Sequence, residues 1–217
     1  AYLSVDHDGL VSVTNLAQNI GRSETLVSIM MANNEIGSIQ PIKDLCEVAH
    51  SKGALFHTDA VQAVGHISID VHDLGVDMLS ASAHKFNGPK GIGFLYVRKG
   101  IDMSPYISGG GQEYGLRSGT ENVASIVGMA VALRENIESL EKNQSHIQQL
   151  ESLLLRLLDE SDIIYQRNGA DNHVPGNISL SFPGHSGESI LHRLDLQGIC
   201  ISTGSACNSK DTVVSHV

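Results

Sequence analysis

Residues 80–93 read SASAHKFNGPKGIG and hold one lysine, Lys85, between a histidine and a phenylalanine. The residues that lead into it, Met78–Ala83, are small or apolar and predict a buried strand. Gly88 and Pro89 follow and predict a sharp bend. Lys85 is therefore expected at the carboxyl end of a strand. A lysine in that position is usually a solvated surface residue, so only its neighbours can give it a chemical role.

Segments on both sides of this stretch predict an α/β fold with a mostly parallel sheet. A helix is expected at 41–53, because Pro41 suits a first turn and Gly53 a stop. Strands separated by such helical stretches favour parallel crossover units. The last strand follows its neighbour too closely for a helix, so it must be joined differently. The expected strands are Leu26–Met30, 54–60, 77–83 and 91–99.

The second half of the chain predicts a smaller α+β unit joined by a long helix. Between residues 122 and 160, apolar residues recur at three- and four-residue steps, typical of a packing helix, with a break expected near Asn143. After it, 177–184 and 198–204 are expected as strands around a helix at 186–198. We divide the chain into a large domain at 1–133 and a small domain at 134–217.

Composition excludes several classes of protein. The net charge of −10 argues against nucleic acids and anionic membrane surfaces as partners. The chain shows no apolar run of the roughly 20 residues that a membrane span needs. Its three cysteines are too scattered for a disulfide framework, and the absence of CxxC or HExxH spacing predicts no metal site. A cytoplasmic location is expected.

The neighbours of Lys85 suggest a cofactor. Groups just past the carboxyl ends of parallel strands converge on one crevice, so Asp59 and Lys85 are expected to face a single ligand. Pyridoxal phosphate needs a lysine amine for its aldehyde and a carboxylate that keeps its ring nitrogen protonated. An amine in an apolar pocket loses its proton more readily than one in water. Alternatives stay open, because Asp59 could cap a helix and Asn34 could simply suit a turn before Gly37.

Four motifs, in this order, resemble the cysteine desulfurases, which are pyridoxal-phosphate enzymes of fold type I related to class-V aminotransferases. The motifs are HTDAVQAVG at 57–65, SASAHKFNGPKGIGFLYV at 80–97, GGGQEYGLRSGTEN at 109–122 and STGSACNS at 202–209. The resemblance extends over essentially the whole chain. It implies a partial copy of the family fold, without the segment that carries a phosphate loop and a ring-stacking histidine, and without a substrate-binding arginine. We expect this chain alone to turn over poorly.

The resemblance also implies roles for individual residues. Lys85 binds the cofactor aldehyde, Asp59 pairs with the pyridinium nitrogen and Gln62 donates a hydrogen bond to the phenolic oxygen. The remaining cofactor contacts fall on Ser82 and His84 at the phosphate, Thr120 at the phosphate of the partner subunit, and Asn34 near the cofactor oxygen and the substrate carboxylate. His84 is also a candidate for assisting proton transfers.

Cys207 is expected to be the reactive thiol. Small residues surround it and offer little bulk to bury it, whereas Cys46 and Cys200 are predicted to be buried in a helix and a strand. In the family, the matching cysteine takes sulfur from L-cysteine as a persulfide and releases L-alanine. A homodimer that supplies an acceptor protein, such as an iron–sulfur scaffold, or a tRNA thiolation pathway is implied. A selenocysteine lyase and a non-catalytic scaffold remain as alternatives.

Overall fold

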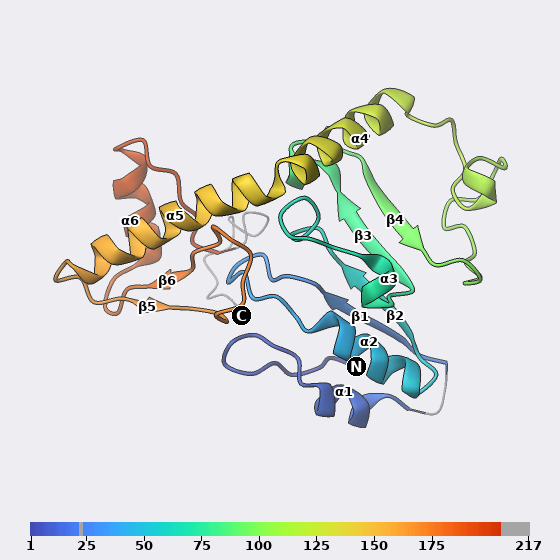
Figure 1. Cartoon of the computed structure of the whole chain (residues 1–217), viewed down its shortest axis with the longest axis horizontal. Coiled ribbons are helices and arrows are strands. Elements are labelled where there is room, and N and C mark those ends of the chain that lie inside the picture. The colour runs from blue at the N-terminus through green and yellow to red at the C-terminus, as the bar shows by residue number, and fades with distance from the viewer. Residues whose placement is uncertain (22–23, 205–217) are drawn as a thin grey trace.

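A four-stranded sheet forms the centre of the computed structural model, which describes residues 1–21 and 24–204 (Figure 1). Its strands are β1 (Leu26–Met30), β2 (Leu55–Asp59), β3 (Met78–Ser82) and β4 (Gly93–Val97), in that spatial order. The first three are parallel and β4 is antiparallel to β3. The predicted mostly parallel sheet is confirmed, as is the different connection of the last strand, because the short link leaves no room for a crossover.

Three helices pack near one face of this sheet: α1 (Val13–Asn19), α2 (Ile42–Ser51) and α3 (Val71–Leu74). The apolar side chains of α2 recur at helical spacing and are buried, as predicted for this segment. In β1, β2 and β3, every second residue, such as Phe56 and Leu79, is buried on the same side of the sheet. This packing leaves the remaining strand residues on the opposite face.

The opposite face carries a polar row across three strands. His57 on β2 lies between two serine hydroxyls, with Ser28 Oγ 2.8 Å from Nδ1 and Ser80 Oγ 3.2 Å from Nε2. Apolar residues lie beside this row, and Leu26 and Leu95 are 56% and 45% exposed. Within the described residues, this face is therefore only partly covered.

The long helical segment divides into α4 (Val123–Glu138) and α5 (Leu140–Asp159), which Figure 1 shows as a bent rod. A break is present, as predicted, but it lies at Ser139, four residues before the expected position near Asn143. Asn143 lies inside α5 and donates its amide to the Ser139 carbonyl. The two helices are anchored at different places, since the Asn136 side chain bonds to Phe86 and the Gln144 side chain bonds to His66.

The rod leads to a small unit of β5 (Gln166–Arg167), β6 (Leu180–Ser181) and α6 (Gly187–Asp195). The strand expected at 177–184 shrinks to β6, which pairs with β5. The strand expected at 198–204 is absent from the described structure. Gly198 adopts a left-handed conformation and the Ile199 amide bonds back to Leu194, so the chain closes α6 there. Cys200 is accordingly exposed, which corrects its predicted burial.

No helix among residues 1–21 and 24–204 combines the length and the apolar character that a membrane crossing requires. Although α5 has 20 residues, charged and amide side chains recur along it.

Candidate active site

Three parallel strands end at one edge of the sheet, and predicted site residues follow each of them. The register pairs Met30 with Asp59, and Asp59 with Ser80. Ser82, His84 and Lys85 come directly after Ser80 on β3 or just beyond it. Because the carboxyl ends of parallel strands meet at the same edge, this edge is where an open α/β sheet binds its ligand.

Lys85 lies in η1 (Ala83–Phe86), a single 3₁₀ turn that begins where β3 ends. Asn87 closes the turn with φ of 66°, a conformation that asparagine tolerates. The Gly88 amide then bonds to the Ala83 carbonyl at 2.8 Å, and a Cβ on Gly88 would lie 2.9 Å from that of Ala83. The predicted bend is therefore present and requires glycine. Lys85 is half-buried above the fully buried Phe86.

Side chains from distant segments hold the main chain of this turn. His66 Nε2 donates to the Lys85 carbonyl at 2.7 Å, and Asn136 Nδ2 donates to the Phe86 carbonyl at 2.8 Å. Gln144 from α5 in turn donates to the His66 carbonyl. These contacts were not predicted from the sequence. Nothing in the spacing of residues 66, 85 and 136 signals that they meet.

Asp59 ends β2 and starts a turn. Its Oδ1 accepts the Val61 amide at 3.0 Å, and Gln62 is half-buried on the same turn. Asp59 therefore does cap a backbone amide, as the alternative reading expected, but it caps a turn rather than a helix. A carboxylate can accept several hydrogen bonds, so this contact leaves acceptor capacity for a ligand.

Two histidines contribute to the same region. His84 is exposed and its Nδ1 lies 2.8 Å from Ser82 Oγ, so two predicted phosphate-binding side chains touch. His57 lies two residues before Asp59 on the same face of β2. Burial lowers the pKa of His57 from its ordinary value of 6.5, and the nearby charge of Asp59 opposes that shift. No role for His57 was predicted from the sequence, although strand alternation signals that it shares a face with Asp59.

Asn34 lies at the tip of the turn that follows β1. Asn33, rather than Asn34, builds the turn: its Oδ1 accepts the amides of Glu35 and Ile36 at 2.8 and 3.0 Å. The Gly37 amide closes the turn on the Asn33 carbonyl. Asn34 is exposed on this turn, so its side chain is accessible to solvent.

Two predicted residues are not placed at this edge. Thr120 is exposed in the long connection from β4 to α4, which extends away from the sheet (Figure 1). Ser118 and Gln112 fix that connection internally, through bonds to the Gly110 carbonyl and the Gly119 amide. Cys207 lies outside the described residues. Among the residues that the structure does describe, no group of three or more His, Cys, Asp or Glu side chains could hold a metal ion.

Comparison with known proteins identifies the fold. The model of the class-V aminotransferases matches residues 1–216. The chain belongs to the class-V aminotransferase family. This family member is similar to a solved NifS-like protein, with a TM-score of 0.87 and 41% identity over 94% of this chain and 56% of the other. A NifS-like protein from Rickettsia africae gives a TM-score of 0.87 at 32% identity, over 98% of this chain and 60% of the other. The predicted fold type I is confirmed.

Curated relatives agree with these structures. The chain is 48% identical to the cysteine desulfurase IscS of Dictyoglomus turgidum, over 100% of this chain and 55% of that protein. It is 44% identical to the cysteine desulfurase IscS of Methanosarcina thermophila, over 100% of this chain and 54% of that protein. The chain thus spans about half the length of the curated relatives that it matches.

Proposed function

We propose that this protein acts as a pyridoxal-phosphate-dependent cysteine desulfurase. One observation carries the proposal. At one edge of the sheet, Asp59 ends β2 and Ser82 ends the parallel β3, and His84 and Lys85 come directly after β3. Relatives that match the whole chain are named cysteine desulfurases, and one similar structure, at 36% identity, is that of SspA in complex with cysteine. The division of the chain at residues 133 and 134 remains our proposal as well.

The chemistry of the edge residues fits the cofactor. When bound, pyridoxal phosphate supplies an electron sink for the charge that develops on the substrate carbon. Lys85 offers an amine held on a rigid turn, and its nitrogen would bind the aldehyde and move the substrate α-proton. The Asp59 carboxylate would keep the ring nitrogen protonated. Ser82 and His84 already touch each other and would bind phosphate oxygens together.

Three further residues complete the proposed site. Gln62, on the turn after Asp59, would donate to the phenolic oxygen, and Asn34 would reach the substrate carboxylate. Thr120 would serve the phosphate in a partner subunit, which is consistent with its place in a connection that extends away from its own sheet. The proposal therefore includes a homodimer. His84 would also assist proton transfers at the phosphate end of the site.

Cys207 would take the sulfur. Its thiolate attacks the sulfur of L-cysteine, the bond between that sulfur and the β-carbon breaks, and a proton goes to the carbon. One L-cysteine and one thiol thus become one L-alanine and one persulfide, without an external oxidant or reductant. We propose that the persulfide passes to an acceptor protein in the cytoplasm, for iron–sulfur cluster assembly or tRNA thiolation.

The test is the intact mass of the full-length protein after brief exposure to L-cysteine. We expect one added sulfur that a reductant removes, together with L-alanine. The Cys207→Ser variant should lose the added sulfur, because a serine hydroxyl is a far weaker nucleophile toward sulfur than a thiolate. Added sulfur that persists in Cys207→Ser, or that disappears in Cys200→Ser, would contradict the assignment.

The same assay with selenocysteine separates the alternatives. A selenocysteine lyase would release alanine much faster from selenocysteine and would depend less on Cys207, because selenium leaves more readily than sulfur. A non-catalytic scaffold would release alanine from neither substrate.

A further inference from the structure

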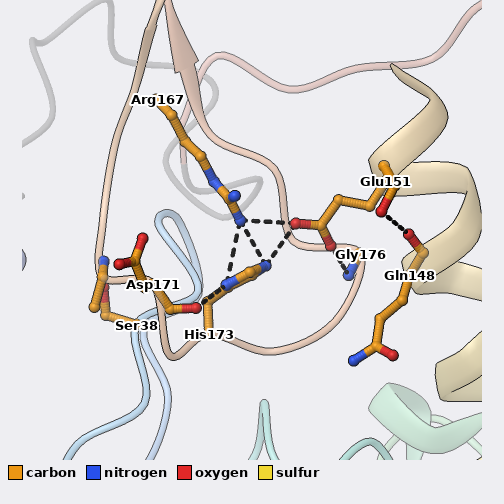
Figure 2. Close-up of polar contacts among 9 residues, drawn as sticks. Ser38, Gln148, Glu151, Arg167, Asp171, His173 and Gly176 are labelled. Carbon is orange, nitrogen blue, oxygen red and sulfur yellow. Dashed lines mark hydrogen bonds and ion pairs between the residues drawn. The ribbon is translucent and has the colours of Figure 1, made fainter. Parts of the chain in front are cut away.

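A buried carboxylate on α5 anchors the segment that connects β5 and β6. The Glu151 side chain is 8% exposed, and its Oε1 lies 2.7 Å from Arg167 Nη2 and 2.7 Å from His173 Nε2 (Figure 2). Its Oε2 accepts the Gly176 amide at 3.1 Å. A buried charge is tolerated only when it is paired and hydrogen-bonded. Glu151 is both: it binds Arg167 on β5 and, in the connecting segment, His173 and the Gly176 amide.

His173 stands at the centre of this cluster. Its Nδ1 lies 2.8 Å from the Asp171 carbonyl, so Nδ1 carries a hydrogen and donates it. Its Nε2 lies 2.7 Å from both Arg167 Nη2 and Glu151 Oε1. A neutral ring can accept from Arg167, and a protonated ring can donate to Glu151. The ring therefore keeps a partner in either protonation state.

The main chain of the anchored segment pairs with the chain beyond the Asn34 turn. The Val174 amide donates to the Gly37 carbonyl at 3.0 Å, and the Ile39 amide donates to the Asn172 carbonyl at 3.0 Å. These bonds join residues far apart in the sequence as a short antiparallel ladder. Neither segment lies within a regular strand, so no wider sheet within the described residues extends this pairing.

Ser38 and His173 form the bridge pair at the middle of this ladder. Ser38 is fully buried; its Oγ accepts the Ala170 amide at 2.9 Å and donates to the Asp8 carbonyl at 2.6 Å. His173 therefore belongs both to the Glu151 cluster and to the ladder: its side chain contacts Glu151 and its backbone faces Ser38 (Figure 2).

The contact has no spare room. Gly169 has φ of +89°, and a Cβ there would lie 2.6 Å from the Ile36 carbonyl oxygen. Gly37 has φ of +74°, and its Cβ would lie 2.8 Å from that of Asn177. Both glycines lie where larger residues would push the two segments apart.

We propose that Glu151, together with Arg167 and His173, is a positioning residue for the turn that carries Asn34. The cluster clamps 170–174 onto 37–39. Residues 37–39 form the base of the turn, since the Asn33 amide bonds to the Ser38 carbonyl at 3.0 Å. A side chain on α5 thereby sets the place of Asn34 without touching it. The consequence for catalysis rests on the proposed function; the clamp itself does not.

Amide hydrogen exchange of the full-length Glu151→Gln variant tests the clamp. Glutamine keeps the shape of the side chain but removes the charge that binds Arg167. We expect exchange at Ile39 and Val174 to speed up at least about tenfold, which equals about 1.4 kcal/mol of local stability. The matched control is Glu160→Gln, at the end of the same helix, where an exposed carboxylate lies 4.0 Å from Arg156. That variant should change these rates by less than about twofold.

Two results would overturn the clamp. Unchanged exchange at Ile39 and Val174 would show that Glu151 does not hold the ladder. Equal acceleration in β3 would show that Glu151 supports the whole fold rather than this contact.

A kinetic cycle tests the link to Asn34. Glu151→Gln should lower kcat/KM for L-cysteine by roughly threefold or more, but by less than about twofold in an Asn34→Ala background, because positioned and positioning residues are coupled. Independent, multiplying effects would contradict the route through Asn34. If the parent protein releases no alanine, the proposed function fails, and the exchange result alone decides the clamp.

Discussion

Cys46 and Cys200 are two thiols in opposite surroundings. Cys46 is buried on α2, and burial, with a smaller contribution from the charge of Asp77, raises its pKa to about 11. At pH 8, on the order of one Cys46 thiol in a thousand is ionised. Cys200 is exposed after α6. We predict that iodoacetamide at pH 8 labels Cys200 in the native protein and leaves Cys46 unmodified.

Peptide mass mapping after a short reaction measures both sites in one sample. Labelling in urea is the control, since both thiols should then react. Native labelling of Cys46 at the rate of Cys200 would show that α2 opens readily and that its packing is weaker than described.

Some of the site could be predicted residue by residue, and some could not. The positions of Asp59 and Lys85 were predictable because Asp59 ends β2 and Lys85 follows the end of β3, and strand ends follow from local composition. The roles of His66 and Asn136 were not, because they depend on where other segments fold back onto the Lys85 turn. For Asn34, the sequence indicated a turn but not that Asn33 builds it.

At the scale of elements, the polar row across β1, β2 and β3 makes stability depend on pH. Burial lowers the pKa of His57, so the folded protein binds this proton less readily than the unfolded chain does. Below the ordinary value of 6.5, the unfolded state then holds more protons at this site. The free energy of unfolding should therefore fall as pH drops from 7 toward 5, and His57→Gln should reduce that fall.

Urea unfolding at pH 7 and at pH 5 measures the effect. His72→Gln, the same substitution at an exposed position on α3, is the matched control. An equal loss of stability on acidification in the parent and in His57→Gln would contradict the contribution of the row.

Elements set by local sequence were predicted best. The antiparallel β4 followed from its short link to β3, and α2 from its proline start, its glycine stop and its apolar spacing. The break in the long helix was predicted at the wrong position, because the contacts that anchor α4 and α5 lie in other parts of the chain. The prediction of a strand at 198–204 rested on apolar residues that suit a strand. It was wrong because the Ile199 amide bonds back to Leu194 and ends α6 instead.

At the scale of the whole molecule, the edge of the parallel sheet and the small unit meet through the Glu151 cluster. The contact joins residues 37–39 to residues 170–174, and neither segment carries a periodic pattern that predicts a partner. Fold type I could be predicted from four ordered motifs, whereas this contact required the structure. It links the predicted small unit to the turn that presents Asn34.

The central claim is that the parallel edge is a pyridoxal-phosphate site with Lys85 as its covalent anchor. Borohydride fixes the bond between a lysine nitrogen and the cofactor aldehyde, so reduction followed by peptide mass mapping of the full-length protein locates it. We predict that the pyridoxyl mass lies on the peptide with Lys85, at close to one per chain, and that Lys85→Ala lacks it. A pyridoxyl group on Lys90 or another lysine, or none after incubation with the cofactor, would contradict the account.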